Sequence, residues 1–213
     1  MGVNSNTCTI GLILLRDNNT VGYAGGLQGN AARVIPTNLE YLSKADSVVL
    51  STGNIDFTLV AHVYLNSTSN IMVIANKGDM NNQNVRDYSL YYGGAGGSFG
   101  FRVGNGSTTA AVTSSQIVTA NAWYTIVAWH SAANDTLNIQ VNNGTVNSIS
   151  YAGGAMDTTF PLSIGAHSNG SYGFDGRIDE VALYKRVLTA SERTWLYNRG
   201  FGRNFAELGS SSG

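Results

Sequence analysis

The stretch Phe57-Thr-Leu-Val-Ala-His-Val-Tyr-Leu65 decides the fold, because its apolar side chains recur at every second position. Successive side chains of a β-strand point to opposite faces, so Phe57, Leu59 and the alternate residues as far as Leu65 share one face. This pattern predicts a β-strand with one face in a core. Shorter stretches with the same alternation lie at 71–75, 88–92, 99–103, 123–130 and 137–141. The series predicts an antiparallel β-sandwich or barrel.

Two of these stretches indicate how the strands are arranged. Trp123-Tyr-Thr-Ile-Val-Ala-Trp-His130 is largely apolar on both faces, which predicts a central strand. The stretch 137–141 runs into Asn142-Asn-Gly144, and an Asn-Gly pair suits the positive φ angles of a tight hairpin turn. We therefore expect 137–141 and 145–151 to pair as a hairpin.

One helix is predicted, and it lies near the C-terminus. Thr189-Ala-Ser-Glu192 has the spacing of a capping box. In this motif the Thr189 hydroxyl accepts a hydrogen bond from the Glu192 N–H, and the Glu192 side chain accepts one from the Thr189 N–H. Trp195 and Leu196 follow as apolar anchors, and Gly200 can adopt the left-handed conformation that ends a helix. We expect a short helix that covers one edge or face of the sheets.

The composition limits the classes of function. The chain has 213 residues, of which only 12% are charged, with 12 basic against 13 acidic side chains and a net charge of −1. This balance provides no electrostatic attraction for a nucleic-acid backbone or an anionic membrane surface, so we expect neither as a partner. Cys8 is the single cysteine, so the fold must hold without an intrachain disulfide.

Three segments are expected along the chain. Residues 1–19 form an N-terminal segment whose apolar run at 10–15 reads as a buried strand. That run is far shorter than the roughly 20 residues of a membrane span. No basic residues precede it, so we expect neither membrane insertion nor a secretory signal. Residues 20–208 form one domain, and 209–213 form a flexible tail.

Several short motifs in a fixed order give the chain a family resemblance. They are Gly29-Asn-Ala-Ala-Arg-Val34, Asp56-Phe-Thr-Leu59, Lys77-Gly-Asp79, Pro161-Leu-Ser-Ile-Gly165, Phe174-Asp-Gly-Arg-Ile-Asp-Glu-Val181 and Lys185-Arg-Val-Leu-Thr-Ala-Ser-Glu192. Together they resemble a laminin G-like domain of the concanavalin A-like lectin/glucanase superfamily. The resemblance implies an all-β jelly roll of two stacked antiparallel sheets, used mostly to bind glycans or proteins and less often to hydrolyse glycans. His62 departs from this pattern, because relatives commonly have tryptophan there.

Glycoside hydrolysis is the least favoured activity. Retaining enzymes need two carboxyl groups about 5 to 5.5 Å apart. The hydrolases of the superfamily place theirs as Glu-X-Asp-X-X-Glu, and none of the four glutamates stands in that pattern. The nearest set is Asp175, Asp179 and Glu180, with the two aspartates on one strand face around Arg177 and Glu180 on the other. The arginine would lower both aspartate pKa values, which makes a poor catalytic pair.

A second interpretation of Asp179 is that it binds a structural calcium ion. Calcium binds six to eight oxygen atoms, many of them backbone carbonyls, so one aspartate beside a loop can contribute to a site. Many concanavalin A-like folds have such an aspartate on the equivalent strand, and the resemblance therefore implies Asp179 as a calcium ligand. The simpler alternative is that Asp179 pairs with an arginine or caps a turn.

The loop at 77–87 is the most polar stretch of the chain, and it joins two predicted strands. Asp79, Asn81, Asn84 and Asp87 offer the donors and acceptors that sugar hydroxyls require, and Tyr88 could stack on a sugar ring. These five residues are the predicted ligand-binding set. The alternative is that the loop is merely solvated and the tyrosine belongs to the core.

These observations favour a non-enzymatic, lectin-like module that recognises a glycan through loops at one end of the sandwich. The alternative is a structural or adhesive component of a cell surface or virion that makes protein contacts. Either implies a location outside the cell or on a particle surface. The sequence does not name the ligand or the oligomeric state.

Overall fold

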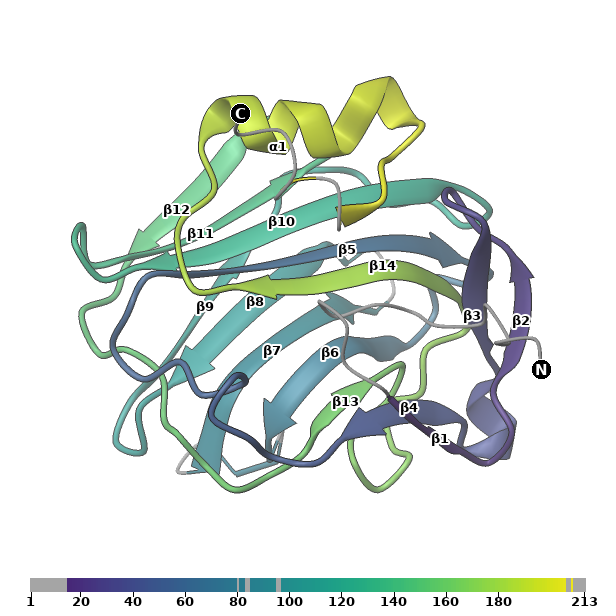
Figure 1. The fold of residues 1–213 in the computed structure, drawn as a ribbon, viewed down its shortest axis with the longest axis horizontal. Coiled ribbons are helices and arrows are strands. Elements are labelled where there is room, and N and C mark those ends of the chain that lie inside the picture. The colour runs from purple at the N-terminus through teal and green to yellow at the C-terminus, as the bar shows by residue number, and fades with distance from the viewer. Residues whose placement is uncertain (1–14, 80, 83–84, 95–96, 206–207, 209–213) are drawn as a thin grey trace.

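A computed structural model describes residues 15–79, 81–82, 85–94, 97–205 and 208, and it contains two antiparallel sheets of seven strands each. The first sheet, in spatial order, consists of β1 (Arg16–Asn18), β4 (Tyr41–Lys44), β13 (Leu162–Ile164), β6 (Ile71–Gly78), β7 (Arg86–Gly93), β8 (Phe99–Gly104) and β9 (Thr109–Thr113). The second consists of β12 (Val146–Ser150), β11 (Thr136–Val141), β10 (Trp123–Ser131), β5 (Phe57–Leu65), β14 (Gly176–Tyr184), β3 (Asn30–Val34) and β2 (Gly22–Gly25). The two sheets stack as a jelly-roll sandwich (Figure 1), as the sequence predicts.

The core fills the space between the sheets with the alternating side chains that the sequence indicates. β5 pairs with β10 on one side and β14 on the other, so it lies at the centre of the second sheet. The Phe57 ring contacts Tyr88 and Phe101 of the first sheet at centroid distances of 5.7 and 6.0 Å. The predicted hairpin between β11 and β12 is also present, but its positive φ angles of 51° and 53° fall on Asn142 and Asn143, one residue before the expected Asn-Gly pair.

A C-terminal helix covers the outer face of the second sheet. α1 (Ala190–Tyr197) and the 3₁₀ turn η3 (Asn198–Gly200) follow β14, and a further 3₁₀ turn, η1 (Pro36–Asn38), joins β3 to β4. Leu196 packs in one buried cluster with Val60 and Trp129, so the second sheet is apolar on both faces where the helix crosses it. Figure 1 shows α1 above β10, at one side of the second sheet. Asn198 ends the helix at a φ of 46°, two residues before the predicted Gly200.

The outer face of the first sheet is polar instead. The strand pairings place Arg16, Ser43, Ser163, Asn76, Ser89 and Arg102 in one row across six neighbouring strands. The inward-facing residues beside this row, such as Leu42 and Ile164, belong to the core. None of the described helices is long and apolar enough to cross a membrane.

Candidate functional site

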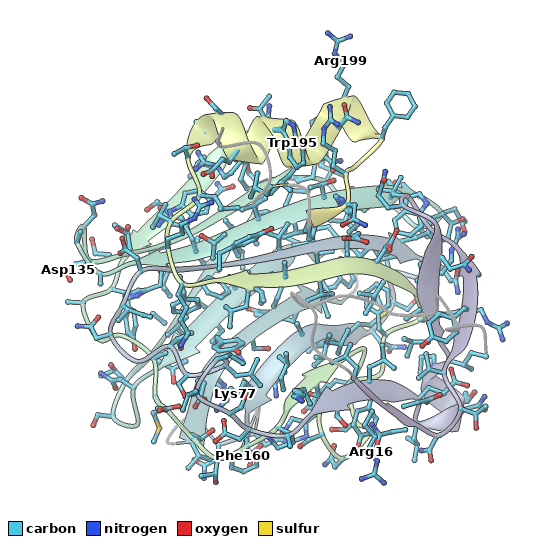
Figure 2. All side chains as sticks on the ribbon, viewed as in Figure 1. Arg16, Lys77, Asp135, Phe160, Trp195 and Arg199 are labelled. Atoms are coloured by element: carbon cyan, nitrogen blue, oxygen red, sulfur yellow. The ribbon has the colours of Figure 1, made fainter. Side chains whose placement is uncertain are left out.

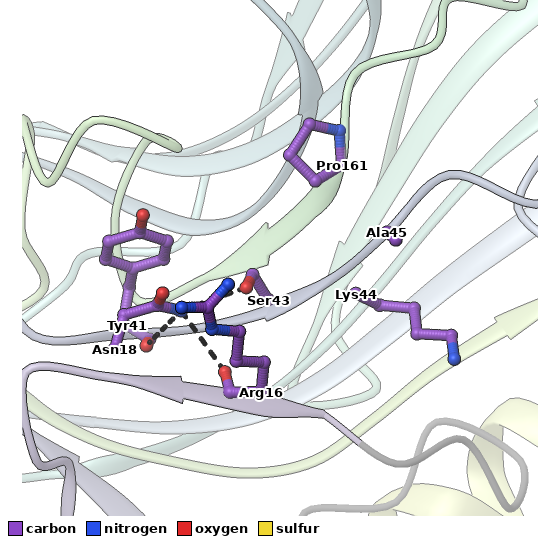
Figure 3. A pocket seen from close by; sticks show the side chains of 7 residues that line it. All are labelled: Arg16, Asn18, Tyr41, Ser43, Lys44, Ala45 and Pro161. Carbon is purple, nitrogen blue, oxygen red and sulfur yellow. Dashed lines mark hydrogen bonds between the residues drawn. The ribbon is translucent and has the colours of Figure 1, made fainter.

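A hollow of about 450 Å³ lies at the β1 end of this polar row, and we call it the first-sheet hollow. Its lining residues are Arg16, Asn18, Tyr41, Ser43, Lys44, Ala45 and Pro161 (Figure 3). The volume falls within the range of small-molecule sites, which combine an apolar surface with a few convergent polar groups.

The pairing of β1 with β4 builds this hollow. Asn18 lies opposite Tyr41 and Arg16 lies opposite Ser43, so all four side chains project from the same face of the sheet. The Asn18 Nδ2 donates to the Tyr41 carbonyl at 3.2 Å and to the Ser43 Oγ at 2.9 Å. These bonds, drawn in Figure 3, fix the amide and the hydroxyl relative to each other. The lining groups are therefore ordered before any ligand binds.

The chemistry of the hollow suits a polyhydroxylated ligand. Tyr41 supplies a half-buried ring, and its hydroxyl donates to the Ser168 carbonyl at 2.8 Å, which holds the ring in place. Arg16 is exposed and supplies hydrogen-bond donors at the rim. Figure 3 shows the Lys44 side chain extending away from Asn18, so only its stem is near the polar cluster. An aromatic ring beside fixed donors and acceptors is an arrangement that can hold a sugar.

Two of the predicted ligand-binding residues lie beside the loop that carries Ser168. The Asn81 Oδ1 accepts a hydrogen bond from the Tyr172 hydroxyl at 2.9 Å. The Asp79 Oδ1 accepts the Asn81 N–H at 2.8 Å and lies 3.6 Å from the His167 Nε2. Asp79 and Asn81 therefore join the β6–β7 loop to the β13–β14 loop. Ser168 of the β13–β14 loop contacts Tyr41, but Asp79 and Asn81 are not among the described residues that line the first-sheet hollow.

Asp87 and Tyr88 are not placed to meet a ligand, and this corrects the sequence-based expectation. Tyr88 is fully buried, with its ring against Phe57 in the core. Asp87 is 1% exposed and receives the Lys77 ammonium at 2.7 Å. Burial raises the pKa of Asp87, and the hydrogen bond from Lys77 opposes that rise. Asn84 lies outside the described residues.

The three carboxylates of the hydrolase alternative have separate structural roles. Asp175 accepts the Asn66 amide at 3.0 Å. Asp179 is buried and accepts the Gln28 N–H at 2.9 Å. Glu180 was expected on the strand face opposite Asp179. However, a β-bulge in β14 and a φ of 49° bring its carboxylate to the Phe205 N–H at 2.9 Å, on the helix side of the sheet.

The surroundings of Asp179 do not fit a calcium ion. Its Oδ2 accepts the Gln28 N–H, and a Cβ added to Gly26 would lie 2.4 Å from the same oxygen, so the carboxylate is packed against the turn that it caps. Backbone N–H groups repel a cation. The described residues also contain no cluster of three or more His, Cys, Asp or Glu side chains. Calcium at Asp179 stays a prediction, tested by whether a chelator changes the melting temperature.

Sequence reasoning missed the residues of the first-sheet hollow. Arg16 and Asn18 fall in the segment 1–19, whose expected strand at 10–15 lies outside the described residues except for Leu15, which packs against the core. Tyr41 and Ser43 flank Leu42 at strand spacing, a signal that they share a face away from the core. Nothing local indicates that β1 would pair with β4, because the partners are about two dozen residues apart.

The chain belongs to the concanavalin A-like lectin/glucanases superfamily, since the model of that family matches residues 40–192. This match confirms the family resemblance of the sequence motifs. No curated protein matches the chain.

Solved structures of the same fold are similar at low identity. The binding domain of Paraclostridial Mosquitocidal Protein 1 has a TM-score of 0.71 and 15% identity over 87% of this chain and 47% of that one. Domain 4 of the arabinanase AbnA of Geobacillus stearothermophilus, solved in complex with arabinotriose, has a TM-score of 0.64 and 14% identity over 87% and 82%. The enzymatically active domain of the bacteriophage CBA120 tailspike protein 2 has a TM-score of 0.65 and 13% identity over 94% of this chain and 33% of that one. This chain thus spans about half the length of the first of these proteins, and the similarities show the fold.

Proposed function

We propose that this protein is a non-enzymatic carbohydrate-binding domain and that its glycan binds in the first-sheet hollow. The observation that carries the proposal is the convergence of the Tyr41 ring, the Asn18 amide and the Ser43 hydroxyl on one open concavity of about 450 Å³. A sugar presents hydroxyls that need paired donors and acceptors and C–H faces that pack on aromatic rings. The hollow offers both.

The structural neighbours support a binding role of this kind. One is the binding domain of the mosquitocidal protein, another neighbour of the same fold is the binding domain of botulinum neurotoxin serotype G, and the arabinanase domain was solved in complex with arabinotriose. This chain has the same fold, and we infer that it also binds a carbohydrate. The toxins, the extracellular arabinanase and the tailspike also favour a location outside the cell or on a particle surface.

A binding role fits the hollow better than hydrolysis does. Its described lining residues include no aspartate or glutamate, so this part of the chain does not supply the hollow with the two carboxyl groups that a glycosidase requires. Asp175, Asp179 and Glu180 each bind a donor within the protein instead. We therefore expect no release of reducing sugar from any glycan that binds.

The proposal is tested on an array of oligosaccharides, followed by titration calorimetry with the best ligand. Tyr41→Ala removes the ring that packs on the sugar. We expect the affinity of this variant for the oligosaccharide to be lower by about tenfold or more, as for the loss of a buried aromatic contact in other complexes. Arg199→Ala is the matched surface control, because Arg199 and Arg16 lie at opposite ends of the molecule (Figure 2). Equal affinity of Tyr41→Ala and wild type would exclude this site.

The alternative function, a structural or adhesive component that makes protein contacts, gives a different result. It predicts a defined oligomer in solution and no signal on the array. Sedimentation velocity on the same preparation separates the two functions.

A further inference from the structure

A second surface, on the opposite sheet, combines two arginines with two aromatic rings. Arg33 of β3 pairs with Arg177 of β14, Arg177 pairs with Tyr64 of β5, and Tyr64 pairs with Trp123 of β10. The four residues form one transverse row over three strand spacings, about 14 Å. Their sequence neighbours, such as Ile178 and Val63, lie in the core, so the row faces outward. We call it the arginine–aromatic row.

The contacts within the row are specific. The Arg177 guanidinium lies 4.0 Å from the centre of the Tyr64 ring and 5.2 Å from the centre of the Trp123 ring. Its Nη1 donates to the Gly25 carbonyl at 2.6 Å. These contacts fix the guanidinium over the two rings, whose centroids are 5.6 Å apart. The row is therefore a preorganised surface.

The charge of the row is not balanced within the described part of the chain. Arg33 and Arg177 lie directly opposite each other on neighbouring strands, where Cβ atoms are about 5 Å apart and like charges destabilise a sheet. No described carboxylate oxygen lies within 4.0 Å of either guanidinium. Arg33 is exposed and lies over Gly22, where an added Cβ would come within 3.0 Å of its Nη2. An anion bound between the two arginines would remove the repulsion.

We propose that the arginine–aromatic row is a second binding site, specific for a carboxylate-bearing sugar. A carboxylate can accept paired hydrogen bonds from a guanidinium, and these charge-assisted bonds are about twice as strong as neutral ones. Tyr64 and Trp123 are half-buried, and Arg177 covers a face of each ring, so the two rings hold the guanidinium in position for the carboxylate. α1 covers Val60 and Trp129 of the same sheet face, while the row lies toward the other ends of β5 and β10. The site is separate from the first-sheet hollow and does not depend on it.

The test compares acidic glycans with neutral partners of the same size. The probes are sialyllactose against lactose and trigalacturonate against galactotriose, titrated into the whole chain by calorimetry at low salt. We expect each acidic probe to bind more tightly than its neutral partner. We also expect that advantage to shrink at salt on the order of 0.5 M, where exposed charges are screened. Arg33→Gln should lower the affinity for the acidic probes about tenfold, since a hydrogen bond to a charged group contributes on the order of 1.5 to 3 kcal/mol. The affinity for the neutral probes should not change. Arg199→Gln is the matched control.

The possible outcomes separate this proposal from the first one. If acidic probes bind no more tightly than neutral ones, or if Arg33→Gln and wild type bind them equally, the row is not the site. If Tyr41→Ala abolishes acidic binding while Arg33→Gln does not, the first-sheet hollow holds the acidic sugar and the second site is excluded. If Arg33→Gln is deficient while Tyr41→Ala binds the acidic probes normally, the acidic sugar binds at the row, and the hollow is tested separately with the best ligand from the array. Arg33 is exposed, so its substitution leaves the core intact.

Discussion

Lys77 and Asp87 are oppositely charged side chains that lie buried in the sandwich. Lys77 is 0% exposed, and its ammonium contacts Asp87 at 2.7 Å, Asp46 at 3.1 Å and the Thr158 carbonyl. Asp87 also accepts the Thr158 N–H. These bonds join β6 and β7 to the segment that precedes β13. The pair is thus a structural element of the fold, although the sequence suggested a ligand site.

Removal of one partner should leave an uncompensated buried charge. We expect Lys77→Met to lower the free energy of unfolding by about 3 to 5 kcal/mol, the usual cost of breaking a buried pair. The double variant Lys77→Met/Asp87→Leu should lose much less than the sum of the two single variants, because neither charge remains. Urea unfolding of the four proteins measures this. Additive losses would show that the two charges do not interact.

His62 gives the protein a pH-dependent stability. Burial lowers the pKa of His62 to about 4, against 6.5 for an ordinary histidine. The unfolded chain therefore binds a proton between these values while the folded protein does not, so stability falls as the pH is lowered from 6.5 to about 4. The corresponding loss is about 3 kcal/mol.

His62→Gln should remove this dependence, because glutamine does not titrate and can still bond the Thr125 hydroxyl, which lies 2.9 Å from the His62 Nδ1. Chemical unfolding at pH 7, 5.5 and 4 gives the difference between wild type and variant at each pH. We expect that difference to change in favour of the variant as the pH falls. A difference that stays constant would mean that His62 titrates normally in the folded protein.

At the scale of elements, local sequence predicted most strands and the helix correctly. The alternation at 57–65 and 123–130 specifies which face is buried, and the Asn142–Gly144 turn specifies a hairpin, because both signals act over a few residues. The bulge in β14 was not predictable in this way. Its position depends on how β14 meets β5 and on Glu180 reaching Phe205, a contact across 25 residues.

The capping box of α1 is a local signal whose energy can be measured. The Thr189 hydroxyl accepts the Glu192 N–H at 3.2 Å, and Glu192 accepts the Thr189 N–H at 2.7 Å. We expect Thr189→Ala to lower the free energy of unfolding by about 1 kcal/mol. Thr189→Ser keeps the hydroxyl and is the control. Thermal unfolding followed by circular dichroism compares them, and an unchanged midpoint for the alanine variant would rule out a stabilising cap.

At the scale of the whole molecule, the two outer faces differ in character. The helix α1 covers part of the second sheet with apolar contacts, whereas the outward side chains of the first sheet are polar and include those of the hollow around Tyr41. The fold followed from the sequence because apolar alternation recurs in several long strands, such as β5 and β11. The site did not follow, because it depends on which strands lie side by side at the sheet edge, and β1 joins β4 only in three dimensions.

The central claim is that a sugar binds in the first-sheet hollow. It is tested most directly by an amide NMR titration of the wild-type protein with the best oligosaccharide from the array. We predict that the largest shift changes occur at Asn18, Tyr41 and Ser43 and disappear in the Tyr41→Ala variant. Shift changes confined to other parts of the molecule, or retained in full by Tyr41→Ala, would contradict the claim.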